Sequence, residues 1–320
     1  MYLAASNRFI YAKGKLMKRF VVAVLSILFL LHSAHAGQST GVAKRTAAPA
    51  VKLAATPKAK AAPRAAPAPA SPPRAPYEAY AVAEAESGTV IEGLNMQLKW
   101  PQASLTKLML ACVVMERIER GDLHLTDRVT VSKQAQGMGG TQVFLKAGET
   151  FTLEELMQAA LIESANDAAY AIAEHAAGSS EAFVELMNRK AHALGMGDTA
   201  YYGVHGLPAA AGGNDNVTTC NDMIRLAREA LRHPKILEWT STEHATFRSG
   251  TLAITNKNKL VGRLPAVDGL KTGYTRRAGF NIVATGANGE RRLIVVVLGS
   301  PESKIRDRFA ADKFREYLTN

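Results

Sequence analysis

Three short motifs with reactive side chains follow one another along the chain: SLTK at 104–107, SAN at 164–166 and KTG at 271–273. Serine is a poor nucleophile unless a base lies within hydrogen-bond reach of its hydroxyl group. Ser104 and Lys107 are three residues apart, so on a helix their side chains lie on one face. Burial and the positive end of a helix both favour the neutral amine of a lysine, which can accept the serine proton. The first motif therefore predicts an activated serine nucleophile.

Each motif alone is weak evidence, because an S-x-x-K sequence in a helix is usually a capping serine followed by a solvated lysine. The ordered trio is different, since it is typical of β-lactamases and penicillin-binding proteins. Its context agrees: SLTK opens an apolar helical run over 105–118, SAN follows a helix that begins at Thr152, and KTG lies in a strand-like stretch. The sequence therefore predicts serine acyl-transfer chemistry of the kind that penicillins inhibit.

The first 36 residues have the pattern of a secretory signal peptide. Residues 1–36 contain five basic and no acidic residues, with an apolar run over 21–31 and small residues before Gly37. Met17 is an alternative start that would give a leader of more usual length. An uncleaved anchor is the other interpretation, but the apolar run is shorter than the roughly 20 residues that a spanning helix needs. We therefore expect export, to the periplasm or the exterior of the cell envelope.

Residues 37–76 consist mainly of Ala, Pro, Lys and Arg and predict a disordered tether, because such a segment cannot bury enough apolar surface to fold. The tether carries seven basic residues and the leader five, which leaves a formal charge of −1 for 77–320 out of the total of +11. A near-neutral folded part argues against a nucleic-acid-binding face. The basic tether is either a soluble spacer or a segment that associates with anionic envelope polymers.

The chain has two cysteines, Cys112 and Cys220. Export permits a disulfide bond, but the sequence does not show whether the two residues pair. Cys112 follows Ser104 by eight residues on the same apolar helix, which favours a small buried thiol. No His, Cys and Glu residues have metal-ligand spacing and no glycine-rich phosphate loop occurs. We therefore expect neither a metal nor a cofactor.

Residues 77–320 are long enough for one well-buried domain. Alternating residues around Ser87-Gly88 predict a β-hairpin, and Thr152 with Glu155 predicts a capping box. Helical periodicity follows near 167–177, 180–194 and 218–232, strand-like sequences at 246–255, 266–275, 279–286 and 291–299, and a closing helix at 302–318. The expected fold class is α/β of the α+β type, in which the first hairpin and the last strands share an antiparallel sheet. The site is expected where the edge of this sheet meets a helical lobe.

Three stretches, PQASLTKLML, LIESANDAA and VDGLKTGYT, resemble the serine D-alanyl-D-alanine carboxypeptidases, the low-molecular-mass penicillin-binding proteins. The sequences GTQVFLKAGE at 140–149 and VHGL at 204–207 match spacers of the same family. The resemblance covers 77–320. It implies the penicillin-recognising fold shared by serine DD-peptidases and β-lactamases, with a five-stranded antiparallel sheet flanked by helices and an all-helical lobe.

The resemblance also implies roles for the residues that carry out the reaction. Ser104 is the implied nucleophile that forms an acyl-enzyme, and Lys107 is its general base. Ser164 is implied to pass protons between Lys107 and the leaving amine. Asn166 is implied to hold the peptide groups of the substrate.

A second set of residues is implied to bind the substrate. Lys271 and Thr272 are expected to bind the terminal carboxylate of D-alanine, and Gly273 to keep the strand surface clear. The backbone N–H groups of Ser104 and Tyr274 are expected to form an oxyanion hole. Arg306 is either a further carboxylate-binding residue or a solvated helix residue.

The implied activity is removal of the terminal D-alanine from peptidoglycan stem pentapeptides, with β-lactams as inhibitors. Many relatives add a β-sandwich domain and an amphipathic membrane-anchoring helix after the catalytic part. The sequence stops at Asn320, directly after its closing helix, so no C-terminal anchor of that kind is expected. The shorter architecture also resembles the D,D-endopeptidases, which cut crosslinks instead of terminal D-alanine.

Two other functions are weaker alternatives. A β-lactamase of this type needs a deacylating glutamate in an E-x-x-L-N loop, and the nearest match, Glu185 to Asn188, is one residue short and too close to Asn166. It also lies in an apparent helix. A non-catalytic wall-binding module is disfavoured because all three motifs keep their chemically competent residues.

Overall fold

A computed structural model describes residues 75–318. The predicted leader 1–36 and residues 37–74 of the predicted tether lie outside this range, so both stay predictions. The main sheet is antiparallel and has the strand order β2-β1-β11-β10-β9. Its strands are β1 (Ala79–Glu84), β2 (Val90–Leu94), β9 (Val267–Thr275), β10 (Gly279–Asn288) and β11 (Arg291–Ser300). The predicted five-stranded sheet is therefore confirmed.

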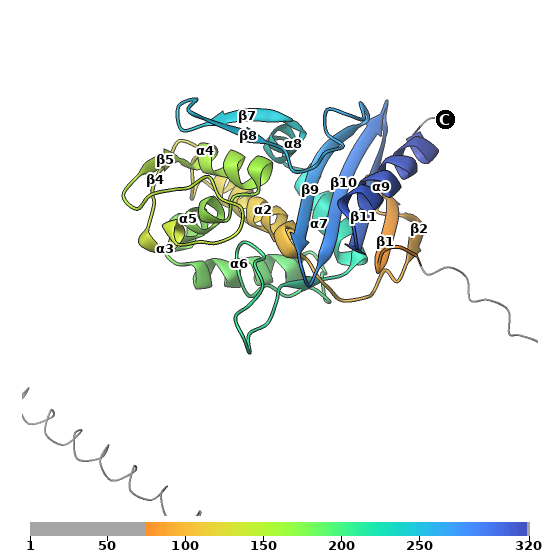
Figure 1. Ribbon diagram of the computed structural model, residues 1–320, viewed down its shortest axis with the longest axis horizontal. Helices are drawn as coiled ribbons and strands as arrows, with labels where there is room; N and C mark the ends of the chain where they lie inside the picture. The colour runs from red at the N-terminus through yellow and green to blue at the C-terminus, as the bar shows by residue number, and fades with distance from the viewer. Residues whose placement is uncertain (1–74, 319–320) are drawn as a thin grey trace, which may run out of the picture. The chain divides into compact units, whose positions relative to one another are not determined.

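Strands β1 and β11, the first and last strands along the chain, lie side by side, as predicted. β1 pairs with β11 from Ala79 opposite Leu298 to Glu84 opposite Leu293. The predicted hairpin between β1 and β2 is also present, with Gly88 at φ +77°, a backbone conformation that glycine adopts without steric cost. Because β10 and β9 continue outward from β11, β9 becomes an edge strand next to the helices (Figure 1).

Side chains alternate between the two faces of the sheet, as expected for a period of two residues. On β11, Val295 and Val297 pack against Phe314 of the closing helix α9 (Ser303–Leu318). Ile294 and Val296 face the other way and belong to the larger core that also contains the helical lobe. In Figure 1, α9 lies across one face of the sheet and the remaining helices lie beside and behind it. The sheet is thus buried on both faces.

The helical lobe contains one long buried helix, α2 (Thr106–Glu119), surrounded by other helices. The others are α3 (Lys133–Gln136), α4 (Leu153–Gln158), α5 (Asn166–Ala177), α6 (Ser180–Ala193), α7 (Cys220–Leu231) and α8 (Pro234–Ser241), with a 3₁₀ turn η1 (Ala103–Leu105) and a π-helical turn η2 (Ala159–Glu163). The predicted capping box at Thr152 and Glu155 is confirmed. Thr219 is the residue that caps α7.

One predicted strand is wrong. The stretch 246–255 does not form a strand of the main sheet but a separate hairpin of β7 (His244–Phe247) and β8 (Leu252–Thr255). The reason is the turn between them, in which Arg248, Ser249 and Gly250 all have positive φ angles. The short ladders of β3 (Trp100–Pro101) with β6 (Val217–Thr218) and of β4 (Arg128–Thr130) with β5 (Thr150–Thr152) had no sequence signal.

Cys112 and Cys220 are both buried and both free. Burial raises the pKa of each thiol, so both are inert at neutral pH. Cys112 and Cys220 therefore do not form a disulfide bond with each other, which the sequence left open.

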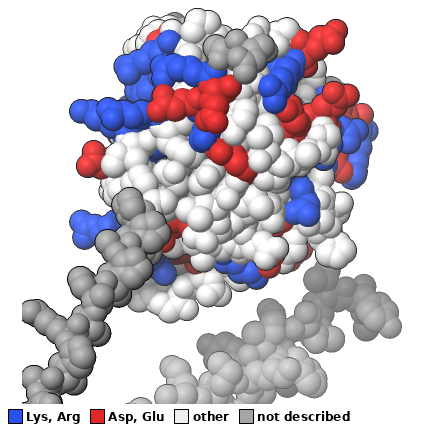
Figure 2. Space-filling model, turned by 90° about the vertical axis from the view of Figure 1, so that its right-hand side faces the viewer, with Lys and Arg blue, Asp and Glu red and all other residues white. Residues whose placement is uncertain are grey.

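The surface around β1, β2 and α9 carries both signs of charge. Figure 2 shows acidic and basic side chains interspersed on this side of the molecule. Several of them form ion pairs, including Arg291 with Glu84 at 2.7 Å and Lys313 with Glu92 at 2.7 Å. Between residues 75 and 318 no helix is both long and apolar enough to cross a membrane.

Candidate active site

Ser104 and Lys107 lie where the 3₁₀ turn η1 passes into helix α2. The Nζ atom of Lys107 donates a hydrogen bond of 3.1 Å to the Oγ atom of Ser104. Lys107 is fully buried among the apolar residues of α2, whereas Ser104 keeps some exposure. The predicted i, i+3 relation therefore brings a hydroxyl group and a buried amine into direct contact.

The other partners of the Lys107 amine are neutral oxygens. It donates to Asn166 Oδ1 at 2.7 Å and to the backbone carbonyl of His205 at 3.0 Å. Burial and the positive charge of Lys271 lower the pKa of Lys107 well below its usual range, and Asp167 only partly opposes this. The site therefore favours the neutral amine, the form that can accept a proton.

His205 does not supply a second base. Burial and the nearby Lys107 lower the pKa of its imidazole to about 4, so the ring is neutral at pH 7. Its Nδ1 atom accepts the backbone N–H of Leu207 at 3.0 Å. The histidine is thus used to shape the 204–207 turn that carries the carbonyl group next to Lys107.

Ser164 directly follows the π-helical turn η2 and lies two residues before Asn166. It is buried and has φ +70°, a left-handed conformation that is uncommon for serine. A π-turn adds a residue to the helix and is frequent at functional sites. No hydrogen bond of the Ser164 hydroxyl group is formed within the described part of the chain. The backbone therefore places Ser164 beside Asn166 without a direct bond to Lys107 or Ser104.

Asn166 lies between Lys107 and the loop over 139–149. Its Oδ1 atom accepts from Lys107, its Nδ2 atom donates to the carbonyl of Gly139 at 2.8 Å, and its backbone N–H donates to the carbonyl of Thr141 at 2.8 Å. One N–H of the side-chain amide is left for another acceptor. Asn166 thus joins Lys107 to the 139–149 loop.

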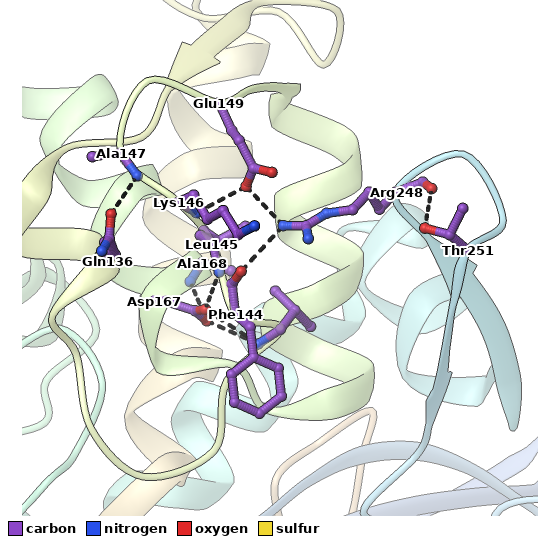
Figure 3. A network of polar contacts seen from close by, with 11 residues as sticks. Gln136, Phe144, Leu145, Lys146, Ala147, Glu149, Asp167, Ala168, Arg248 and Thr251 are labelled. Carbon is purple, nitrogen blue, oxygen red and sulfur yellow. Dashed lines mark hydrogen bonds and ion pairs between the residues drawn. The ribbon is translucent and has the colours of Figure 1, made fainter.

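The neighbouring Asp167 fixes the same loop from within the core. Its fully buried carboxylate accepts the backbone N–H of Val143 at 3.2 Å and of Leu145 at 3.0 Å, and Figure 3 shows these bonds converging on it. Sequence reasoning did not find this residue. An acidic residue in the first turn of a helix usually has an exposed, dipole-compensating role, so only its burial reveals its function.

The KTG sequence lies on the edge strand β9. Lys271 is buried, and its Nζ atom donates only to the carbonyl of Thr272, at 3.0 Å. Burial and the charges of Lys257 and Arg306 lower its pKa to about 7. Lys271 is thus a second buried amine at the candidate site, and no carboxylate of the described residues lies at hydrogen-bonding distance from it.

Gly273 brings β9 against the start of the serine turn. A Cβ atom at this position would lie 2.8 Å from the carbonyl oxygen of Gln102, 3.0 Å from the backbone nitrogen of Ser104 and 3.1 Å from that of Leu105. The sequence predicted that this glycine clears space for substrate. The structure gives a more specific reason, which is that only a residue without a side chain lets the strand approach the backbone of Ser104.

Tyr274 and Arg306 differ in exposure. Tyr274 is 56% exposed and stacks on Phe280 with ring centroids 4.2 Å apart. Arg306 is buried, so its interpretation as a solvated helix residue is wrong. Its guanidinium group pairs with Asp307 at 2.6 Å and donates to the carbonyl of Asn281 at 3.2 Å. Arg306 thus lies behind β10, from where its charge contributes to the lowered pKa of Lys271.

Asn216 is a second positioning residue that sequence reasoning missed. Its amide nitrogen donates to Thr106 Oγ1 at 2.9 Å and to the carbonyl of Gly203 at 2.7 Å. In the same region Gly206 packs so closely on Ala103 that a Cβ atom would lie 1.9 Å from the Ala103 carbonyl oxygen. These contacts hold the 203–206 turn against the first turn of α2, which contains Lys107.

The predicted residues therefore come together to different degrees. Hydrogen bonds join Ser104, Lys107 and Asn166, close packing adds Gly273, and electrostatic coupling adds Lys271. Within 75–318, no group of three or more His, Cys, Asp and Glu side chains could hold a metal ion. The arrangement suits acyl transfer to a serine activated by a neutral lysine.

Comparison with known proteins identifies relatives of the whole domain. The family model for D-alanyl-D-alanine carboxypeptidase, peptidase S11, matches residues 67–302. D-alanyl-D-alanine carboxypeptidase DacF of Bacillus subtilis is 35% identical over 70% of this chain and 57% of its own length. D-alanyl-D-alanine carboxypeptidase DacC of Escherichia coli is 37% identical over 71% of this chain and 58% of its own length. The chain thus spans little more than half the length of these relatives.

Solved structures share the fold. Penicillin-binding protein 5 of Haemophilus influenzae matches with a TM-score of 0.71 and 30% identity over 78% of this chain and 72% of that one. Penicillin-binding protein D2 of Listeria monocytogenes, in an ampicillin-bound form, matches with a TM-score of 0.67 and 29% identity over 74% of this chain and 96% of that one. The chain belongs to the peptidase S11 family of D-alanyl-D-alanine carboxypeptidases.

Proposed function

We propose that this protein is a serine D-alanyl-D-alanine carboxypeptidase that removes the terminal D-alanine from peptidoglycan stem pentapeptides. One observation carries the proposal: the Nζ atom of a buried lysine, whose pKa is lowered, lies 3.1 Å from a serine Oγ atom, where the neutral amine can accept the hydroxyl proton. A buried amine without a carboxylate partner is costly to the fold. Such a group is expected where a reaction needs a base.

In the proposed reaction, Lys107 takes the proton of Ser104 as its Oγ atom attacks the carbonyl carbon between the two D-alanines. The backbone N–H groups of Ser104 and Tyr274 stabilise the oxyanion, a contribution of about 3–4 kcal/mol per donor in serine hydrolases. The C–N bond then breaks and the amine of D-alanine leaves with a proton relayed through Ser164. Water hydrolyses the acyl-enzyme ester and restores Ser104.

Substrate binding is assigned to β9 and Asn166. The terminal carboxylate binds the Lys271 ammonium and the Thr272 hydroxyl group, a charge-assisted pair. The remaining side-chain N–H of Asn166 binds a substrate carbonyl. The guanidinium group of Arg306 already donates to Asp307 and Asn281. We therefore assign Arg306 a contribution to the positive potential from behind the sheet, without a direct hydrogen bond to the substrate.

β-Lactams are expected to acylate Ser104, since the ampicillin-bound relative from Listeria shares the fold. The names of the Bacillus and Escherichia relatives support the carboxypeptidase reaction. We further propose that 1–36 is a signal peptide, that 37–76 is a tether and that 77–320 is the catalytic domain. The enzyme would then act in the periplasm or on the envelope exterior. A basic tether has the charge to associate with anionic envelope polymers.

The decisive experiment is mass spectrometry of residues 37–320 after incubation with labelled penicillin. We expect a stable adduct on Ser104, and none in Ser104→Ala. A protein that gains no mass would contradict the proposed nucleophile.

A second assay separates carboxypeptidase from endopeptidase. The same protein is given a stem pentapeptide and a crosslinked dimer, and free D-alanine is scored against separated stems. We expect D-alanine release from the pentapeptide. If neither product forms while penicillin still binds, the peptidoglycan hydrolase proposal is wrong and a wall-binding role takes its place.

A further inference from the structure

Phe144 is an aromatic side chain on the surface that the proposed reaction leaves unexplained. It is 68% exposed, more than any other large hydrophobic residue in the described part of the chain. Its backbone has φ +57°, a left-handed conformation that is rare for a bulky residue. Strained conformations of this kind persist where the surrounding structure enforces them, and they cluster at functional sites.

The structure holds Phe144 in place from both sides. Its neighbours Val143 and Leu145 are buried, and the backbone N–H groups of both donate to the carboxylate of Asp167. The carbonyl of Phe144 accepts from the guanidinium group of Arg248 at 3.2 Å. Figure 3 shows the phenyl ring pointing away from this network of polar contacts. The ring is thus presented on a rigid support.

Arg248 is itself anchored, so the support extends into two other elements. It pairs with Glu149 at 2.7 Å, and its guanidinium group lies over the ring of Phe151 at 5.5 Å. Glu149 also accepts the backbone N–H of Lys146 at 2.8 Å. The β7–β8 hairpin and the 144–149 loop therefore hold each other, and the backbone on both sides of Phe144 has little freedom to relax.

The same loop begins at the active site. A Cβ atom on Gly140 would lie 2.7 Å from the side-chain nitrogen of Asn166 and 3.0 Å from Leu207. Phe144 follows Gly140 by four positions, so the two Cα atoms lie within about 14 Å of each other. The three stem residues that precede the reacting dipeptide span about 10 Å when extended. This span and the length of the Phe144 side chain are together comparable with the separation, so the stem can meet the ring.

We propose that Phe144 is a specificity-determining residue that contacts the stem peptide on the N-terminal side of its terminal D-alanyl-D-alanine. This inference rests on the proposed function and concerns the substrate length that the same site selects. The methyl and methylene groups of the stem pack on the aromatic ring. The contact lies outside the reacting dipeptide, so it adds binding energy for the long substrate only.

The test compares a stem pentapeptide with a blocked D-alanyl-D-alanine dipeptide. Phe144→Ala and Phe144→Gly both remove the ring, and glycine also removes the strain at φ +57°. We expect kcat/KM for the pentapeptide to fall about tenfold in both variants, mainly through KM, which matches the loss of one aromatic contact. The dipeptide and labelled penicillin should react within about twofold of the parent protein. Phe144→Tyr should restore the pentapeptide value.

Two results would overturn the inference. An equal loss for both substrates would show a purely structural role, and no loss for either would show that the ring contacts no substrate. Leu98→Ala is the matched control, because Leu98 is an exposed apolar residue outside the site loops. A second readout, protection of Ser104 from labelled penicillin by the pentapeptide, measures binding even if the parent protein releases no D-alanine. Absence of D-alanine release would reject the carboxypeptidase reaction, whereas the protection measurement would still test the Phe144 contact.

Discussion

Lysines lie in two different kinds of surroundings within this domain. At the candidate site, the amines of Lys107 and Lys271 bond to uncharged oxygens and to no carboxylate of residues 75–318, and both pKa values are lowered. Between α2, α6 and α7, the amine of Lys190 lies 2.6 Å from Glu229 and 3.1 Å from Glu116. Burial opposes the charge of Lys190, but its hydrogen bonds to the two carboxylates outweigh this effect and raise the pKa.

The difference separates structural lysines from reactive ones. A paired ammonium group stays charged at every physiological pH and contributes to the fold. An unpaired buried amine can change its protonation near neutral pH, which is useful only to a reaction or to ligand binding. The first and third of the following four predictions test this distinction, and all four are given in order of decreasing expected effect.

The largest effect is expected from replacing the amine that contacts the nucleophile. Lys107→Met should slow acylation by labelled penicillin about 10²–10⁴-fold, because a general base typically contributes this much. Lys190→Met makes the same chemical change in the paired surroundings. It should keep the acylation rate while lowering the free energy of unfolding by about 1–3 kcal/mol, since two carboxylates each lose one of their cationic partners. Similar acylation rates in the two variants would contradict the distinction.

The second prediction concerns the contact between β9 and the serine turn. Gly273→Ala should slow acylation about 10–100-fold, because a Cβ atom would press on the backbone nitrogen of Ser104 that is proposed to bind the oxyanion. Gly197→Ala is the matched control, since nothing lies within 4 Å of a Cβ atom there. The acylation rate constant is measured for both. A rate within twofold of the parent in Gly273→Ala would show that the turn can yield.

The third prediction uses the protonation of Lys271, whose pKa is about 7. The cation that binds a carboxylate is present below this value and is lost as the pH rises through it. We expect kcat/KM for the pentapeptide to fall above pH 7, by up to about tenfold per pH unit. A substrate with an amide in place of its terminal carboxylate should lack this decline. Identical profiles for both substrates would show that Lys271 does not bind the carboxylate.

The smallest effect is expected at the nearest match to a β-lactamase glutamate. Glu185 lies on α6, is exposed and lies 3.8 Å from Arg189. Glu185→Gln should leave the lifetime of the penicilloyl adduct unchanged, as measured by the loss of label over time. A longer lifetime in the variant would indicate that this residue activates the deacylating water.

Much of the arrangement follows from the sequence because its signals are local. The spacing of Ser104 and Lys107, the capping box at Thr152 and the turn at Gly88 each depend on a few adjacent residues. The pairing of β1 with β11 followed from two alternating patterns and a resemblance to known proteins. Gly273 was assigned to the site, although its packing partner was not.

Other features could not be predicted because they depend on contacts between distant segments. The π-turn that sets Ser164 and Asn166 has no composition signal. Asp167 looks like an ordinary helix-start residue until it is seen buried among the N–H groups of a loop more than twenty residues away. The burial of Arg306 behind β10 likewise appears only in three dimensions. Asn166, Asp167 and Arg306 each contact backbone groups of distant segments, and such contacts cannot be predicted from residue types.

The pairing of β1 with β11 also has a consequence for the timing of assembly. Strand β1 contributes residues 79–84 and its partner residues 293–298, so roughly two hundred residues separate them. At a synthesis rate of about 5–20 residues per second, the first strand waits on the order of ten to forty seconds for its neighbour. Until then the helix that follows Ser104 has no β9 to rest against. The candidate site is therefore incomplete in a nascent chain until its last strands have emerged.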